Sequence, residues 1–363
     1  MIKVMQVLTD TNIGGAGIWL LNYLKSRNLQ KYEITVVLPE GAKLIPKAEE
    51  QGVKIIEAKS IADCSFSKAG VAELMRIIKS EKPHIVHSHA SFDARIAAKL
   101  CGVKAVHTRH CLEPAKTGIK RMIYSYVNNY LSSKVIGVSN AVVQNLSADG
   151  IKKSKLNMIY NGISPVEIYT PANKLALREK YGFTPDDVVI GLVARLEPVK
   201  NPLLFAEAAK LTSKVCPQAA FILAGDGSLR KEVSQAVKPL GSRMLLTGFM
   251  DNVADAYNAM DIITLTSDSE ALSISLIEGQ STGMAAISTD CGGPREIISD
   301  GVNGYIVPVG DARALADAMI KLIQNPSTRE EFGLKGKMKV QTDFAIESMA
   351  RKTEAIYDEL ADK

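Results

Sequence analysis

Short apolar runs alternate with amphipathic stretches along the whole chain. The runs are almost continuous in Val, Ile and Leu, which is typical of parallel β-strands covered on both faces. In the first half the expected strands are residues 3–8, 34–38, 53–57, 84–88, 104–108, 134–138 and 156–160. The expected helices between them are residues 18–26, 70–79, 94–100, 119–131 and 141–146.

The second half repeats this alternation after a turn-forming segment, Asn161-Gly162-Ile163-Ser164-Pro165. Its expected strands are residues 188–194, 219–224, 244–247, 262–265, 285–288 and 305–307. Its expected helices are residues 202–211, 229–237, 253–260, 275–281, 312–323 and 346–360. The pattern predicts an α/β protein with two doubly wound domains, residues 1–165 and 166–344, each built on its own parallel sheet.

Composition is that of a globular protein, with 46% hydrophobic and 23% charged residues among 363. No apolar run approaches the roughly 20 residues that cross a bilayer, and the N-terminus lacks the features of a signal peptide. The cysteines are odd in number, scattered and never spaced as CxxC, so we expect small buried thiols in a reducing, cytoplasmic compartment. They are Cys64, Cys101, Cys111, Cys216 and Cys291.

Charge is unevenly distributed along the chain. Residues 1–165 hold 23 Lys and Arg against 12 Asp and Glu, a net charge of +11, whereas residues 166–363 hold 21 against 27, a net charge of −6. This asymmetry is either an ordinary scatter of solvated charge or a division of labour between the halves. In the second case the basic first domain would meet an anionic acceptor or membrane surface.

The expected helix at residues 119–131 carries both apolar and basic side chains. Apolar residues at positions 123, 127, 130 and 131 form one stripe, which favours a helix packed on the core with a solvated basic start. The alternative is a helix face that touches anionic lipid or an anionic acceptor.

The stretch from residue 265 to 294 holds the strongest chemical pattern. It predicts a strand, a polar loop, a short helix that starts near Ser275, a second strand and a glycine-rich loop. The first amides of a helix have no internal partner and attract anions. Glu270 precedes the helix start and Glu278 lies inside it, so the segment suits a ligand with a central phosphate and hydroxyls on both sides. A nucleotide sugar has that shape.

A second helix start follows the first strand. Gly14-Gly15-Ala16 leads directly into the helix, so its backbone could approach a ligand closely. The loop is neither a GxGxxG fingerprint nor a GxxxxGK[ST] phosphate loop, and by itself such a glycine pair more often forms a tight turn.

Histidines mark the ends of two further strands. His87 and His89 point to the same side of their strand, and Arg109-His110 end the next one. We interpret His87 as a core residue and His89 as a candidate for hydrogen bonding to a ligand hydroxyl or for proton transfer. A metal site is disfavoured because no acidic pair lies nearby in the sequence.

Two cations follow the first strand of the second half. Arg195 and Lys200 flank a proline-containing turn, and Asn201-Pro202 predicts a helix start beside them. Such cations can hold a diphosphate, and the chain has no DxD motif that would carry Mg²⁺ or Mn²⁺ to it. We therefore expect no metal and no cofactor. The loops 225–227 and 248–251 end the next two strands and should line the same site.

In this order, the motifs resemble those of the retaining nucleotide-sugar glycosyltransferases of family 4, which have the GT-B fold. The resemblance covers nearly the whole chain. It rests on Gly14-Gly15-Ala16, His89, Arg195 with Lys200, Gly225-Asp226-Gly227, Glu270 with Glu278, Gly283, and Gly292-Gly293-Pro294 with Glu296. It implies two Rossmann-like domains that face each other across a cleft, with the C-terminal helix, residues 345–363, packing back on the first domain.

The resemblance also implies residue roles. Arg195 and Lys200 would hold the donor diphosphate and stabilise its charge as it leaves. Glu270 would contact the transferred sugar, Glu278 the ribose, and His89 the region of the sugar's primary hydroxyl; His89, Arg195, Lys200 and Glu270 are the expected catalytic set. Other donor-side positions would supply amides or border the base, namely Gly14, Gly15, Ala16, Gly225, Phe249, Met250, Leu272, Ser273, Ile274 and Ser275. Asn12, Arg109 and His110 are placed on the acceptor side.

One position departs from the family pattern. The family often has Phe-Gly where this chain has Leu272-Ser273, and the Cβ of Ser273 narrows the approach to the sugar. This departure bears on the identity of the donor sugar.

We expect a UDP-sugar, because bacterial members of the family suggest it and no feature favours guanine. Since no carboxylate stands out as a nucleophile on the first domain, front-side attack is favoured over a covalent intermediate.

The resulting expectation is a metal-independent hexosyltransferase that moves a sugar to a hydroxyl of a lipid-linked or cell-surface glycan precursor, in polysaccharide biosynthesis. It would act in the cytoplasm or at the inner face of the cell membrane, with no nucleic-acid partner. Alternatives are a UDP-sugar 2-epimerase of the same fold and a transferase with a small-molecule acceptor. A dehydrogenase is disfavoured by the missing GxGxxG, and a non-catalytic sugar-binding protein by the missing secretion signal.

Overall fold

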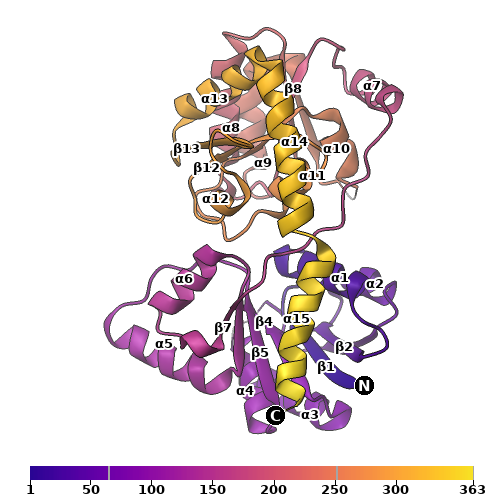
Figure 1. The fold of residues 1–363 in the computed structure, drawn as a ribbon, viewed down its shortest axis with the longest axis vertical. Helices are drawn as coiled ribbons and strands as arrows, with labels where there is room; N and C mark the ends of the chain where they lie inside the picture. Colours follow the sequence, from indigo (N-terminus) through magenta and orange to yellow (C-terminus); the bar gives the residue numbers. More distant parts are fainter. Residues whose placement is uncertain (64–65, 251, 363) are drawn as a thin grey trace. The chain divides into compact units, whose positions relative to one another are not determined.

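The chain folds into two compact α/β units. The computed structural model describes residues 1–63, 66–250 and 252–362. Unit 1 comprises Met1–Ser164 and Phe344–Lys363, and unit 2 comprises Pro165–Asp343. Each has a parallel sheet between layers of helices (Figure 1), which confirms the predicted fold class of two doubly wound, Rossmann-like domains. Cys64, and Asp251 at the end of the predicted loop 248–251, lie outside the described residues.

Unit 1 is built on a seven-stranded sheet in the order β3-β2-β1-β4-β5-β6-β7. Its strands are β1 Ile2–Leu8, β2 Tyr32–Pro39, β3 Lys54–Ala58, β4 Ile85–His89, β5 Lys104–Arg109, β6 Lys134–Gly137 and β7 Leu156–Met158. Its helices are α1 Gly15–Ser26, α2 Ile45–Glu49, α3 Lys68–Glu81, α4 Phe92–Leu100, α5 Gly118–Leu131, α6 Asn140–Ala148, the short η1 Lys153–Lys155 and α15 Ile346–Ala361. Because strand side chains alternate between faces, Val4 and Leu8 pack with α1 and α15, whereas Met5 and Val7 pack with α3 and α4.

Unit 2 is built on a six-stranded sheet in the order β10-β9-β8-β11-β12-β13. Its strands are β8 Val188–Val193, β9 Ala219–Ala224, β10 Met244–Gly248, β11 Ile262–Leu265, β12 Ala285–Thr289 and β13 Gly304–Val307. Its helices are α7 Pro171–Lys180, η2 Pro198–Lys200, α8 Pro202–Ser213, α9 Arg230–Val237, η3 Lys238–Arg243, α10 Ala254–Ala259, α11 Ile274–Ser281, α12 Pro294–Ile297, α13 Ala312–Gln324 and α14 Pro326–Asp343. The main core lies between the sheet and α8 and α13, and α11 and α14 pack together beside β12.

Each sheet reverses its strand order once, between β1 and β4 in unit 1 and between β8 and β11 in unit 2. Loops that leave the carboxyl ends of these paired strands diverge, and in open α/β sheets ligands bind at such points. Gly14 follows β1 and His89 ends β4, while Lys200 follows β8 and Glu270 follows β11. The sheet topology therefore brings separate sequence motifs to one edge of each sheet.

Helix α14 was not predicted by the sequence pattern, because few of its residues are apolar. Its buried residues are Phe332, Gly333, Gly336 and Val340. The helix lies so close to the end of α11 that a Cβ on Gly333 would stand 1.9 Å from the carbonyl oxygen of Gly283. Because two of these four buried residues are glycines, too few apolar side chains remain for hydrophobic periodicity to detect the helix.

Helix α5 does not pack as the favoured interpretation of its sequence required. Of the four apolar positions in the predicted core stripe, only Leu131 is buried, and Ile123 and Tyr130 are 59% and 58% exposed. The interpretation of α5 as a core-packing helix was wrong because its inner face is polar. Asn128, which is buried, donates from Nδ2 to the carbonyl oxygen of Tyr124 and accepts from Arg95.

The expectation of buried thiols holds only in part. The four cysteines in the described part of the chain are free. Cys216 and Cys291 are buried, but Cys101 is half-buried and Cys111, in the loop after β5, is exposed. The prediction was wrong for Cys111 because that loop leaves the sheet edge.

Substitution of Gly333 by Ala should destabilise unit 2. In an open helix this change stabilises by about 1 kcal/mol, but here a rigid backbone carbonyl occupies the space of the new methyl group, so we expect a loss of about 1–3 kcal/mol. Denaturant unfolding measures the effect. Gly15→Ala in α1, where a Cβ meets no atom within 4 Å, is the matched control. A Gly333→Ala variant as stable as the parent would contradict the close packing of α14.

Candidate active site

In unit 2 a backbone contact between two loops fixes the position of Glu270. The N–H of Glu270 donates to the carbonyl oxygen of Cys291 (3.0 Å), and the N–H of Gly293 donates to the carbonyl oxygen of Glu270 (2.8 Å). A Cβ on Gly293 would lie 1.9 Å from the carbonyl oxygen of Ala271, so only glycine permits this approach. The glycine-rich loop after β12 therefore supports the loop after β11.

Lys200 and Glu270 form an ion pair between Nζ and Oε2. Their side chains are 21% and 12% exposed, and the hydroxyl of Ser267 donates to the same carboxylate oxygen at 3.3 Å. The loop after β8 is tied to this place because Thr266 donates from Oγ1 to the carbonyl oxygen of Lys200 (2.8 Å). The adjacency of β8 and β11 thus joins two residues that are far apart in the sequence.

Arg195, the other predicted cation, is exposed, and its guanidinium makes no hydrogen bond to the described residues. Its loop is held in place by the N–H of Leu196, which donates to the carbonyl oxygen of Asp226 (2.9 Å). Asp226 belongs to the predicted loop 225–227. The backbone that carries this cation is therefore fixed, and its guanidinium is exposed to solvent.

The start of α11 presents unpaired amides beside this ion pair. The hydroxyl of Ser273 caps the helix by accepting from the N–H of Leu276 (3.3 Å). The preceding amides make no hydrogen bond among the residues that the structure describes; they belong to Leu272, Ser273, Ile274 and Ser275. Such a group of N–H donors favours an anion.

Glu278 lies on α11 and is oriented by a buried tyrosine. The hydroxyl of Tyr257 on α10 donates to Oε2 of Glu278 (2.8 Å), while Oε1 makes no hydrogen bond to the described residues. Burial raises the pKa of Glu278, and the bond from Tyr257 opposes that shift. One carboxylate oxygen thus remains able to accept from a ligand hydroxyl. In the loop after β10, Phe249 is 73% exposed and Met250 is half-buried.

In unit 1 the predicted glycine loop opens α1. Gly14 is the N-cap and Gly15 the first helical residue, and no atom lies within 4 Å of the place that a Cβ on Gly15 would take. Ala16 is buried and Asn12 is exposed ahead of the helix. The amide end of α1 is therefore open to a ligand.

A hydrogen-bonded chain joins α15 to β4 and β5. The Gln6 amide donates from Nε2 to the hydroxyl of Tyr357 on α15 (2.9 Å). We assign the proton of the Tyr357 hydroxyl to its contact with Nδ1 of His87 (2.5 Å), so that Nε2–H of His87 donates to Oγ1 of Thr108 (2.7 Å). His87 is fully buried, so its predicted place in the core is correct.

The side-chain amide of Gln6 also determines which ring nitrogen of His89 carries the proton. Because Nε2 of Gln6 donates to Tyr357, its Oε1 accepts from Nε2–H of His89 (2.9 Å), and Nδ1 of His89 accepts from Nε2–H of His110 (2.9 Å). This leaves Nδ1 of His110 as a buried acceptor without a partner among the described residues. Burial lowers the pKa of His89 and brings that of His110 to about 3, so both rings are neutral. His110, not His89, therefore has the ring nitrogen without a hydrogen-bond partner among the described residues.

Arg109 is buried and already paired. Its guanidinium contacts Glu113, donates to the hydroxyl of Tyr124 (3.0 Å) and lies 3.6 Å from the carboxylate of Asp149. Placed on the acceptor side by sequence reasoning, it anchors the loop between β5 and α5 to α6.

Sequence reasoning missed Gln6, Tyr257 and Tyr357, which orient the predicted residues. Gln6 did carry a signal, since it is the only polar uncharged residue within an apolar buried strand. The two tyrosines carried none, because their sequence distance from their partners hides the contact.

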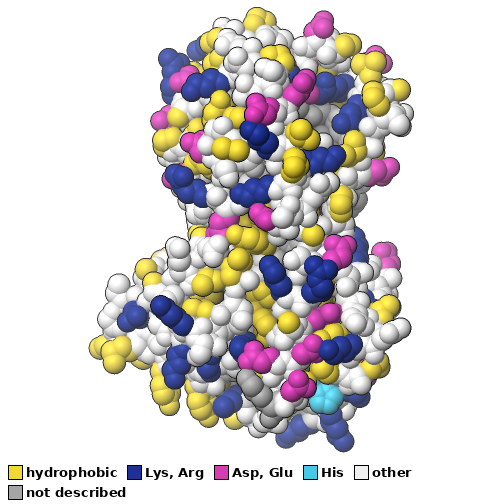
Figure 2. Space-filling view, in the orientation of Figure 1, with side chains coloured by type: hydrophobic (Ala, Val, Ile, Leu, Met, Phe, Trp, Pro, Cys, Tyr) yellow, Lys and Arg dark blue, Asp and Glu magenta, His cyan; other side chains and the backbone are white. Residues whose placement is uncertain are grey.

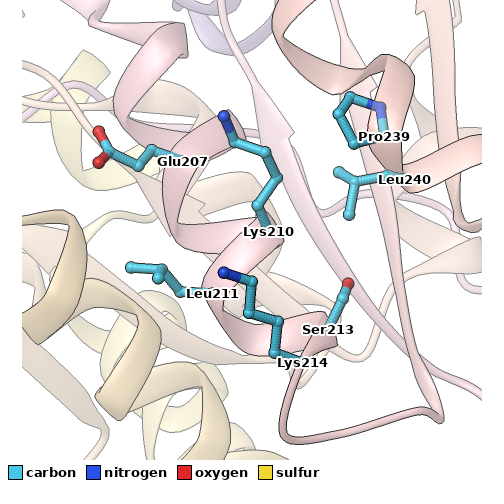
Figure 3. A pocket seen from close by; sticks show the side chains of 7 residues that line it. All are labelled: Glu207, Lys210, Leu211, Ser213, Lys214, Pro239 and Leu240. Atoms are coloured by element: carbon cyan, nitrogen blue, oxygen red, sulfur yellow. The ribbon is translucent and has the colours of Figure 1, made fainter.

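A surface hollow in unit 2 lies away from these residues. It is lined by the end of α8 and by η3, segments that lead into the amino ends of β9 and β10, as Figure 3 shows. Its lining residues are Glu207, Lys210, Leu211, Ser213, Lys214, Pro239 and Leu240. None belongs to the predicted site. Within the described residues, no group of three or more His, Cys, Asp or Glu side chains could hold a metal ion.

Comparison with known proteins identifies the class. Residues 173–339 match the family Glycosyl transferases group 1, and residues 13–167 match Glycosyltransferase Family 4. The chain is 30% identical over 269 residues to the Escherichia coli UDP-Gal:alpha-D-GlcNAc-diphosphoundecaprenol alpha-1,3-galactosyltransferase, covering 69% of this chain and 68% of that protein. It is 26% identical over 362 residues to the Bacillus anthracis N-acetyl-alpha-D-glucosaminyl L-malate synthase, covering 95% and 94%.

Among solved structures, Anabaena HepE in complex with UDP-glucose aligns with a TM-score of 0.85 at 20% identity, covering 99% of this chain and 100% of that one. This likeness confirms the GT-B fold. The chain belongs to glycosyltransferase family 4, as its motifs suggested, and it is a transferase that uses a sugar donor.

Replacing Tyr357 by Phe should disturb the hydrogen-bonded chain that joins α15 to His87 and His89. The change leaves the Gln6 amide and Nδ1 of His87 without a partner, so we expect unit 1 to lose about 1–3 kcal/mol. Nitrogen NMR should find His87 and His89 as Nε2–H tautomers in the parent and a mixture in the variant. Tyr32→Phe, which removes another hydroxyl bonded to α15, is the control that should keep both tautomers. Unchanged tautomers in Tyr357→Phe would refute the assigned chain.

Proposed function

We propose that this protein transfers a hexosyl unit from a UDP-sugar, with retention of configuration and without a metal, to a hydroxyl of a lipid-linked or cell-surface glycan precursor. The observation that carries the proposal is the Lys200–Glu270 ion pair beside the unpaired amides at the start of α11. Cation and amides suit a diphosphate, and the carboxylate suits the sugar attached to it. The free cysteines support a reducing compartment such as the cytoplasm.

The charge of the leaving diphosphate would be met by protein groups alone. The loops that carry Lys200 and Arg195 are held through their backbone before any ligand binds, and the α11 amides belong to the backbone itself, so the main chain needs little reorganisation. Glu278, with its free Oε1 directed by Tyr257, would accept from the ribose. Ser273 caps α11. In the proposed complex it would lie next to the transferred sugar, and its side chain would restrict which sugar fits.

The choice of a UDP-sugar and a lipid-linked acceptor draws on one relative. The Escherichia coli protein at 30% identity is named for UDP-Gal and for a diphosphoundecaprenol-linked acceptor. The solved structure of HepE contains UDP-glucose, which agrees with a uridine donor in this fold.

A small acceptor is the second candidate. The Bacillus anthracis relative, named an L-malate synthase, aligns over nearly the whole of both chains. A panel of undecaprenyl-linked glycans and small hydroxy acids, tested with one donor, distinguishes the two acceptor classes. Incubation with the donor alone tests the epimerase alternative, because an epimerase forms a new sugar nucleotide without any acceptor.

Lys200→Met and Glu270→Gln should each lower turnover of the donor by about 10²–10³-fold, because each removes a charged partner of the transition state. Release of UDP from a series of UDP-sugars measures it, after a thermal-shift panel with UDP-, GDP- and ADP-sugars has selected the base. Lys210→Met and Glu207→Gln, at the hollow of Figure 3, are matched controls that should keep full activity. Full turnover in both the Lys200 and the Glu270 variant would show that these residues are not part of the active site.

Front-side attack makes a separate prediction. The acceptor hydroxyl would approach the anomeric carbon from the side of the departing diphosphate, and a phosphate oxygen would take its proton. The product should keep the donor's anomeric configuration by NMR, and intact-mass spectrometry of the enzyme with donor should find no sugar adduct. A trapped glycosyl-enzyme would replace this route with double displacement.

A further inference from the structure

The outer face of α5 is apolar and exposed. Its exposed large side chains are Ile119 (74%), Met122 (69%), Ile123 (59%), Tyr126 (74%) and Tyr130 (58%). At about 100° per residue, these positions fall within an arc of about 100° on one side of the helix. Figure 2 shows hydrophobic side chains along the outer edge of this part of unit 1.

The opposite face of α5 is polar and faces the rest of unit 1. Ser125 donates to the carbonyl oxygen of Gly150 (2.7 Å), Asn129 donates to the same oxygen (3.0 Å), and Asn128 is buried against Arg95. A surface helix normally buries its apolar side and exposes its polar side. In α5 this arrangement is reversed, and an exposed apolar stripe of this kind marks an interaction surface.

Positive charge surrounds the stripe. From residue 114 to residue 148 the chain contains four Lys and Arg (116, 120, 121 and 134) and no Asp or Glu. Lys116 is paired with Glu113 and Asp149, and Lys134 with Glu359, so the positive charge beside the stripe comes from Lys120 and Arg121. The ammonium of Lys99 lies 4.3 Å from the centre of the Tyr130 ring. Lys120 and Lys152 are exposed. Lys152 directly precedes η1, and its N–H donates to Oδ1 of Asn129 on α5 (3.0 Å).

We propose that the α5 stripe docks on an anionic lipid bilayer, with Ile119, Met122 and Tyr126 entering the headgroup region and the surrounding lysines contacting lipid phosphates. An amphipathic helix with basic residues beside its apolar face has the composition that binds such interfaces. Tyrosine suits the boundary because its ring is apolar and its hydroxyl stays in water. The docking itself does not depend on the proposed function. Only its suggested purpose does, which is to hold unit 1 at the membrane where a lipid-linked acceptor resides.

Charge selects the bilayer over a second copy of the chain. A symmetric contact through α5 would place the lysines of one copy against those of the other, whereas an anionic bilayer complements them. Docking would be peripheral, because none of the helices in the described ranges is long and apolar enough to span a bilayer.

Flotation with vesicles tests the surface directly. The whole protein should bind vesicles of phosphatidylcholine with about one-third phosphatidylglycerol at least about tenfold more than pure phosphatidylcholine at low salt. The triple variant Ile119→Ser, Met122→Ser and Tyr126→Ser should lose about tenfold or more of this binding. The matched control is Leu334→Ser with Met338→Ser, which changes two exposed apolar residues of α14 and should bind as the parent does. Lys120→Glu should weaken binding to the vesicles that contain phosphatidylglycerol and leave binding to pure phosphatidylcholine vesicles unchanged.

Three results would overturn the proposal: no vesicle binding by the parent, unchanged binding by the triple variant, or a dimer in sedimentation that the triple variant abolishes. Slow hydrolysis of the UDP-sugar without acceptor, measured on the same samples, separates this proposal from the proposed function. The triple variant should keep that hydrolysis. If the parent binds vesicles but turns over no nucleotide sugar, the docking surface stands and the proposed function falls.

Discussion

The backbone contact between Gly293 and Ala271 is the constraint on which the candidate site of unit 2 depends. It leaves no room for a side chain, so the loops after β11 and β12 are fixed by main-chain hydrogen bonds. The carboxylate of Glu270 then meets Lys200 because β8 and β11 are neighbours in the sheet. Since the main chain does the positioning, the side chains at this edge remain available for a ligand.

Much of this architecture could be predicted from the sequence, for a physical reason. Strands of a parallel sheet are buried on both faces and read as apolar runs, and their carboxyl ends carry the polar loops. The start of α11 was recognisable because Glu270 and Glu278 lie close in the chain. The contact of Lys200 with Glu270 was not, since it depends on which strands are adjacent. Gln6 was a visible anomaly in β1, but its partner Tyr357 lies at the other end of the chain.

Helices α14 and α5 show two opposite reasons why a sequence pattern can mislead. Helix α14 packs closely through Gly333 and Gly336, so only Phe332 and Val340 of its buried residues contribute to an apolar periodicity. Helix α5 has a clear apolar stripe, but periodicity identifies a face without saying what covers it. In α5 the polar residues Ser125 and Asn128 bond inward and the apolar ones remain outside. Only the side-chain contacts decide between a core and an interface.

Helix α15 has a consequence for how the chain is made. It contributes Met349, Ile356 and Tyr357 to the core of unit 1, yet it follows all of unit 2 in the sequence. During synthesis, unit 2 is complete before the helix that finishes unit 1 emerges, so unit 2 can fold first as a unit. Until then Gln6 and His87 lack the hydroxyl that binds them both. The earliest-made strands are therefore the last to be fully packed, and a nascent unit 1 must wait with an incomplete core.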